Sequence, residues 1–157
     1  MEVYRIQKDK HRDTVLTGEG ARLYGGRWNK EGTPLVYTSS SMELALLEAT
    51  VHFEGLPPAG LPPHILVTIE LPDAAISYPA LELLPPDWHL YEGYPADELA
   101  SFVQRQFQHT GCVGVAVPSV VMPLSRARNI LLNPLSPAMS QVRIVSIQAH
   151  KVDPRLL

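Results

Sequence analysis

The spacing of apolar and polar positions along the 157-residue chain predicts short strands and two main helices. Strands are expected at residues 3–6, 34–38, 64–71, 112–117, 129–132 and 142–148. Good helix formers after a Ser40–Glu43 capping box predict a helix that runs to about Phe53. A second helix is expected from Pro95 to about His109, with Gly111 as its C-terminal stop.

The connections between these elements are rich in glycine and proline. The glycines within residues 17–29 predict a loop whose backbone can approach a ligand closely. The proline pairs at 57–58 and 62–63 predict a stiff connector, and residues 72–94 predict an irregular surface loop. Because strands and helices do not alternate regularly, we expect an α+β fold with mixed β-sheets and a few helices.

Length and composition narrow the class of protein. A chain of 157 residues predicts one compact domain, residues 1–157, and the apolar fraction of 45% argues against a disordered chain. No apolar run is long enough for a transmembrane helix, and the first residues do not resemble a signal peptide. The single cysteine, Cys112, excludes an internal disulfide and is typical of a cytoplasmic protein, which is the expected location.

Charge is distributed unevenly along the chain. Residues 1–30 carry a net charge of +3, residues 31–100 carry −11 with no Lys or Arg, and residues 101–157 carry +5. The total of −3 disfavours general nucleic-acid binding but allows a small anionic ligand. Any cation beside an acid of the middle segment must therefore come from the two ends, and a cleft is expected where these segments meet.

Two charged residues are candidates for chemistry. Arg27, placed among glycines, suits the binding of phosphate or carboxylate, although a surface arginine in a turn has the same pattern. Glu48 lies inside an apolar helix and points either to solvent or into a cleft. His52 follows four residues later and could contact Glu48 on the same helical face.

Three uncharged polar residues have equally open interpretations. Tyr37, in a strand, is either a core aromatic or a ring that stacks on a ligand. Ser119 and Asn133 follow strands and either line a cleft or form turns. The chain has no phosphate-binding loop of the Gly-x-x-x-x-Gly-Lys type, no dinucleotide fingerprint and no zinc-ligand spacing, and the Glu48 and His52 pair alone does not make a metal site.

Several segments together resemble the RES-domain family, the toxins of bacterial type II toxin–antitoxin pairs. The strongest is the glycine-rich block at 18–32 that contains Gly-Gly-Arg-Trp-Asn. The other matching segments are 4–6, 36–40, 45–48 with His52, 117–121 and 129–134. The arginine, glutamate and serine after which the family is named look like Arg27, Glu48 and Ser119.

The resemblance implies a fold like that of ADP-ribosyltransferases, with NAD⁺ as substrate and no further cofactor. It also implies an Xre-type helix-turn-helix antitoxin as partner, no membrane, and contact with nucleic acid only through that antitoxin. Whether the toxin forms a homodimer stays open.

The chemistry of NAD⁺ cleavage suggests a role for each candidate. Glu48 would stabilise the positive charge on the ribose, Arg27 with Arg5 would bind the diphosphate, and Tyr37 would stack on nicotinamide. The remaining candidates, Ser119, Asn133 and His52, would bind substrate or orient the glutamate.

The favoured function is therefore that of an NAD⁺ glycohydrolase or phosphorylase. Two alternatives remain: an ADP-ribosyltransferase that modifies a specific cellular protein, and a non-enzymatic module that binds anions. The chain does not show the Glu-x-Glu pair typical of arginine-directed ADP-ribosyltransferases, which counts against arginine as the acceptor.

Overall fold

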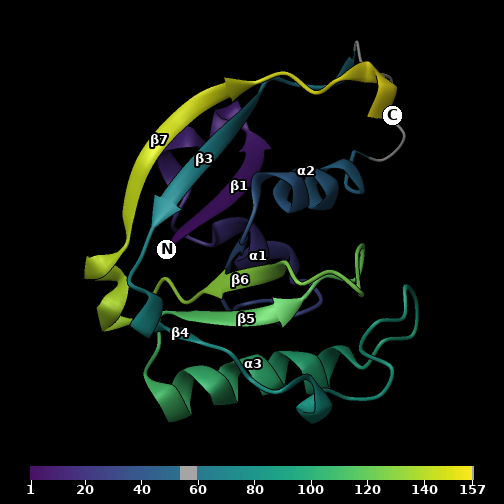
Figure 1. The fold of residues 1–157 in the computed structure, drawn as a ribbon, viewed down its shortest axis with the longest axis vertical. Helices are drawn as coiled ribbons and strands as arrows, with labels where there is room; N and C mark the ends of the chain where they lie inside the picture. The colour runs from purple at the N-terminus through teal and green to yellow at the C-terminus, as the bar shows by residue number, and fades with distance from the viewer. Residues whose placement is uncertain (54–59, 157) are drawn as a thin grey trace.

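Seven strands and three α-helices make up the fold in the computed structural model, which describes residues 1–53 and 60–156 (Figure 1). The strands are β1 (Glu2–Lys8), β2 (Val36–Ser39), β3 (His64–Glu70), β4 (Ile76–Ser77), β5 (Gly114–Pro118), β6 (Arg128–Leu132) and β7 (Arg143–His150). The α-helices are α1 (Glu19–Tyr24), α2 (Met42–Thr50) and α3 (Ala96–Thr110). Short 3-10 helices lie at Asp9–Thr14, Asp73–Ala75, Leu81–Leu83, Pro137–Gln141 and Pro154–Leu156.

The strands form one mixed sheet in the order β4-β5-β6-β2-β1-β3-β7. Neighbours pair antiparallel except for β4 and β5, which are parallel. The join between β1 and β2 is short, because the only pair in register is Tyr4 with Ser39 in the described part of the chain. The sheet therefore divides into two halves that diverge from this join, with α2 packed against β1 and β2 (Figure 1).

The α+β fold with a mixed sheet is confirmed, and so are the six predicted strands within a few residues at their ends. One further strand was not predicted: β4 lies within residues 72–94, which were expected to form an irregular loop. It is only two residues long and forms because Ile76 and Ser77 pair with β5, which no local pattern reveals. Part of the predicted proline connector, at 57–58, lies outside the described residues.

The start of α2 differs from the predicted capping box by one residue. Ser41, not Ser40, is the N-cap, and its hydroxyl accepts a hydrogen bond from the Leu44 amide at 3.2 Å. Ser40 instead accepts a hydrogen bond from the Arg128 amide at 2.9 Å, which ties the beginning of the helix to β6. The helix ends at Thr50, before the predicted Phe53.

The glycine-rich segment was expected to be a loop, but it contains helix α1. Gly18, at φ 66°, precedes the helix, and a Cβ on it would lie 2.6 Å from the Leu35 amide nitrogen. Gly25, at φ 65°, ends the helix. Glycines therefore stand at both ends of this helix, because only glycine adopts these angles without strain. The beginning of the helix also packs closely against the backbone of Leu35.

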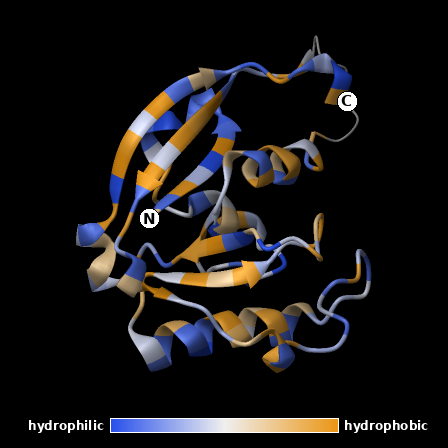
Figure 2. Ribbon diagram, in the orientation of Figure 1, coloured by the Kyte–Doolittle hydropathy of each residue, from blue (hydrophilic) through white to orange (hydrophobic). Residues whose placement is uncertain are grey.

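Two apolar cores lie on opposite faces of the sheet, since successive strand residues point to opposite sides. Val115, Val117 and Leu131 pack with α3 on one face, while Ala116 and Ile130 belong to the core on the other. Figure 2 shows the hydrophobic residues of α3 on the side that faces the sheet. The predicted bounds of α3 are confirmed, with Gly111 at φ 63° as its C-cap.

Within residues 1–53 and 60–156, no helix is long and apolar enough to cross a membrane.

Candidate active site

A cavity of about 220 Å³ lies where the two halves of the sheet diverge, between α2 and the strands. We call it the Glu48 cavity. Its walls come from β1, from β2 and α2, which follow one another closely in sequence, and from β6, so three distant segments of the chain contribute to it. The lining residues are Tyr4, Arg5, Ile6, Tyr37, Thr38, Ser39, Ala45, Glu48, Ala49, His52 and Asn129.

The Glu48 carboxylate is held by two hydrogen bonds to the same oxygen. The Ser119 hydroxyl donates to Glu48 Oε1 at 2.8 Å, and the Asn129 Nδ2 donates to it at 2.6 Å. Ser119 is 1% exposed, so its hydroxyl is available to protein groups rather than to bulk water. Of the two orientations left open by the sequence, Glu48 thus points into the cavity rather than to solvent.

Arg5 contributes a positive charge to the cavity from β1. Its Nε donates to Gln7 Oε1 at 2.6 Å and its Nη1 donates to the Tyr37 carbonyl at 2.9 Å. It forms no ion pair with any carboxylate of the described residues. Burial lowers the pKa of Arg5 to about 10. A guanidinium held by neutral groups alone keeps its charge available for an anionic ligand.

The Tyr37 hydroxyl is bound by the glycine-rich segment, while the residue also lines the cavity. It donates to Asn29 Oδ1 at 2.7 Å and accepts from the Trp28 amide at 3.2 Å. Burial raises the pKa of Tyr37 well above its ordinary value, so the phenol stays protonated. Tyr37 is thus a rigid wall of the cavity, a property that suits a stacking ring.

Arg27 does not line the Glu48 cavity. Its Nη1 donates to the Trp88 carbonyl at 2.8 Å, and its guanidinium lies 3.8 Å from the centre of the Tyr94 ring. Burial lowers the pKa of Arg27, whereas Tyr94 and Glu48 favour its charged form. Arg27 therefore holds the segment around Trp88 against the glycine-rich segment, within electrostatic reach of Glu48. At the cavity itself, the basic first segment meets the acidic middle segment through Arg5.

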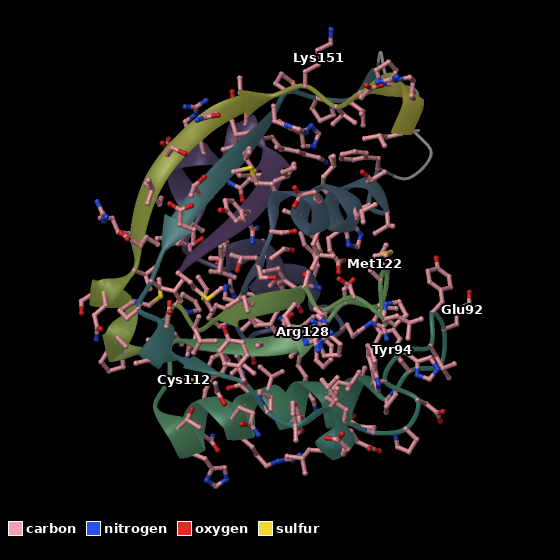
Figure 3. The ribbon with its side chains drawn as sticks, in the orientation of Figure 1. Glu92, Tyr94, Cys112, Met122, Arg128 and Lys151 are labelled. Carbon is pink, nitrogen blue, oxygen red and sulfur yellow. The ribbon has the colours of Figure 1, made fainter. Side chains whose placement is uncertain are left out.

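Ser119 and His52 are two further predicted site residues, and only Ser119 contacts the Glu48 carboxylate. Ser119 contacts Glu48, and His52 lines the cavity from the turn after α2. Among the described residues, the side-chain hydrogen bonds of Glu48 come from Ser119 and Asn129, so His52 does not hold it. Figure 3 shows Tyr94, Met122 and Arg128 toward the side where β5 ends, with Cys112 near the beginning of that strand.

Asn133 does not line the Glu48 cavity. Asn133 follows the far end of β6, and its Oδ1 accepts a hydrogen bond from the Leu135 amide at 3.0 Å, as in a turn. The asparagine at the cavity is Asn129, at the other end of the same strand. Four residues of strand separate them by about 13 Å. The sequence signal for Asn129 is its position as a polar residue directly before the apolar run of β6.

Within the ranges 1–53 and 60–156, no cluster of three or more His, Cys, Asp or Glu side chains could hold a metal ion.

Comparison with known proteins identifies the family. The sequence model of the RES domain matches residues 2–153. A relative from Yersinia enterocolitica named "Toxin Res" is 33% identical over 160 residues, covering 99% of both chains. A relative from Sphingobium named "Prs ADP-ribosylating toxin" is 35% identical over 147 residues, covering 90% of this chain and 86% of its own.

A solved structure shows the same fold. The crystal structure of the M. tuberculosis MbcT–MbcA toxin–antitoxin complex matches 99% of this chain and 85% of that chain, with a TM-score of 0.68. At 20% identity this similarity concerns the fold alone.

Proposed function

This chain belongs to the RES-domain family, and we propose that it is the toxin of a toxin–antitoxin pair, an enzyme that consumes NAD⁺ by cleaving the bond between nicotinamide and ribose. One observation carries the proposal. The Glu48 carboxylate accepts two hydrogen bonds inside a cavity that also contains the Arg5 guanidinium. Among the described residues, Arg5 forms no ion pair with a carboxylate. Such a cavity suits a substrate that is anionic at one end and becomes positively charged at the other.

The chemistry at Glu48 resembles glycoside hydrolysis. When the bond breaks, its electron pair leaves with the nicotinamide nitrogen, and positive charge develops on the ribose carbon and its ring oxygen. A carboxylate close to that carbon stabilises the charge as it forms. Water then adds to the ribose carbon and loses a proton, which yields ADP-ribose. Phosphate as the acceptor would yield phosphorylated ADP-ribose instead.

The remaining groups bind and orient the substrate. Arg5 is placed to bind the diphosphate through charge-assisted hydrogen bonds. Tyr37, fixed by Asn29, offers a rigid ring for the nicotinamide. Arg27 lies outside the cavity lining, and its role would be to support the site and to attract the anionic part of NAD⁺ at longer range.

A second candidate function is transfer of ADP-ribose to a specific protein. The observation that favours it is the Sphingobium relative at 35% identity, whose name describes an ADP-ribosylating toxin. Cleavage and transfer share the same bond-breaking step, so the same cavity would serve both, and only the acceptor differs.

An antitoxin of the Xre type is the proposed partner. The support is that the matching crystal structure is a toxin–antitoxin complex. This antitoxin would be a separate protein that suppresses NAD⁺ consumption.

The test is to incubate the purified protein with NAD⁺ and to identify the products by chromatography and mass spectrometry. Release of nicotinamide with ADP-ribose indicates hydrolysis, and phosphorylated ADP-ribose formed in phosphate buffer indicates phosphorolysis. Labelled protein after incubation with a cell lysate and labelled NAD⁺ indicates transfer. Intact NAD⁺ in all three experiments contradicts the proposal and favours a binding module.

A further inference from the structure

Asn129 donates to Glu48 with one end of its side-chain amide, and the other end also needs a partner. The two ends have opposite properties, since the nitrogen only donates and the oxygen only accepts. A carboxylate accepts only, so Nδ2 must face Glu48, as the 2.6 Å contact requires. The Asn129 oxygen then points away from Glu48. Because Asn129 is 8% exposed, that oxygen cannot rely on bulk water.

Ser39 supplies the missing donor. Its hydroxyl lies 2.8 Å from Asn129 Oδ1, and the residue is 3% exposed. Ser39 and Asn129 are partners in the register of β2 and β6, so the backbone of two antiparallel strands sets the distance between the side chains. The hydrogen bonds form a chain in which Ser39 donates to Asn129 and Asn129 donates to Glu48, and such chains strengthen each member.

The chain of hydrogen bonds leaves one carboxylate oxygen of Glu48 available. Both bonds, from Ser119 and Asn129, end at Oε1. Oε2 accepts no hydrogen bond from the residues that the structure describes. The carboxylate is thus anchored by one oxygen, which ties α2 to Ser119, directly after β5, and to Asn129 on β6. Because Glu48 lines the cavity, the other oxygen is the one left for a ligand there.

We propose that Ser39 and Asn129 are positioning residues, which together hold Glu48 so that its free oxygen faces the ribose of NAD⁺. This inference rests on the proposed function. Without the Ser39 hydroxyl, the Asn129 oxygen is buried without a donor, and the amide turns to find one. That rotation removes Nδ2 from Glu48 and frees the carboxylate to move. Ser39 acts through Asn129, because its hydroxyl donates to Asn129 Oδ1 and is thereby committed to that bond although the residue lines the cavity.

The kinetic experiment compares Ser39→Ala with the conservative variant Ser39→Thr. Ser39→Ala is expected to lower kcat for nicotinamide release about 10-fold or more, because a displaced catalytic group lowers the rate while binding is retained. The KM for NAD⁺ should change about twofold or less, since Arg5 and Tyr37 are untouched. Ser39→Thr keeps a hydroxyl and should recover most of kcat. A raised KM with unchanged kcat would overturn the proposal.

A double-mutant cycle separates positioning from general structural damage. Because Ser39 acts through Asn129, Ser39→Ala should cause no further loss of kcat in an Asn129→Ala background. Losses that multiply would overturn the proposal. Ser77→Ala is the matched control, since Ser77 also donates to a side-chain amide oxygen, that of Gln106 at 3.3 Å, but on β4 away from the cavity. Its kcat should equal that of the wild type, and an equal loss there would assign the Ser39 effect to stability.

A measurement that does not depend on activity distinguishes failure of this inference from failure of the proposed function. In ¹⁵N NMR spectra, the side-chain amide protons of Asn129 should exchange slowly with solvent in the wild type and faster in Ser39→Ala. Unchanged exchange would overturn the positioning role. If the wild type leaves NAD⁺ intact but Ser39→Ala accelerates the exchange, the proposed reaction is wrong while the positioning of Glu48 stands.

Discussion

Two hollows in this molecule hold acidic and basic side chains together, but their construction differs. The Glu48 cavity, of about 220 Å³, draws its walls from β1, β2, α2 and β6. A groove of about 390 Å³ beside α3, which we call the α3 groove, contains Asp97, Glu98 and Arg105. The α3 groove is larger, yet its charged side chains come from a single helix and are exposed.

The two hollows differ less in size than in how many distant segments of the chain supply their polar groups. In the Glu48 cavity, Ser119 and Asn129 reach the carboxylate from residues 71 and 81 positions away in the sequence. In the α3 groove, Asp97 pairs with Lys30 at the surface, with 85% of the Asp97 side chain exposed. Water screens such a pair, whereas the groups of the Glu48 cavity are partly desolvated and act strongly on a ligand.

The largest expected effect comes from removing the charge of Glu48. Glu48→Gln keeps the shape of the side chain but cannot stabilise the positive ribose, so nicotinamide release should fall about 100- to 1,000-fold. The matched control in the α3 groove is Glu98→Gln, which should leave the rate unchanged. Equal losses in the two variants would remove the distinction between the hollows.

The second-largest effect is expected from replacing the arginine of the Glu48 cavity, compared with the arginine of the α3 groove. Arg5→Lys keeps the charge but loses the planar fork that binds a diphosphate and the hydrogen bonds to Gln7 and Tyr37. The KM for NAD⁺ should rise about 10-fold, with a smaller change in kcat. Arg105→Lys serves as the control and should keep the wild-type KM. Steady-state kinetics with varied NAD⁺ measure both, and an unchanged KM for Arg5→Lys would contradict the assignment of the diphosphate to Arg5.

A third prediction concerns the wall behind the Glu48 cavity. A Cβ on Gly26 would lie 2.7 Å from the Tyr37 hydroxyl oxygen, so Gly26→Ala must displace Tyr37. We expect the free energy of unfolding to fall by about 1–3 kcal/mol and the KM for NAD⁺ to rise severalfold. Gly20→Ala is the control, because a Cβ there meets nothing within 4 Å and alanine favours the α1 helix. Denaturant unfolding and steady-state kinetics measure the two effects. Unchanged stability and an unchanged KM in Gly26→Ala would contradict the prediction.

The smallest effect should come from the ion pair beside the α3 groove. Asp97→Asn removes the Lys30–Asp97 interaction, whose nitrogen and oxygen lie 2.9 Å apart at the surface. Because exposed pairs contribute little to stability, neither the melting temperature nor nicotinamide release should change measurably. A clear loss of activity would mean that the α3 groove takes part in the reaction.

Local sequence patterns predicted most of the elements but not the way they meet. The bounds of α3 followed from Pro95, the periodic apolar residues and Gly111, since all of these act within a few residues of one another. Helix α1 was missed because its glycines suggested a loop, while Gly18 is required by its closeness to Leu35. Strand β4 was missed because two residues form a strand only when a neighbouring strand is present.

The sequence alone determined which residue types were available for chemistry: an arginine near the start of the chain, a glutamate in an apolar helix, and polar residues at the ends of apolar strands. The tertiary structure decided which of them meet. It placed Arg5 rather than Arg27 in the cavity and Asn129 rather than Asn133 beside Glu48. The physical reason is that strand register and the divergence of β1 from β2 set these distances, and both arise from contacts between distant segments.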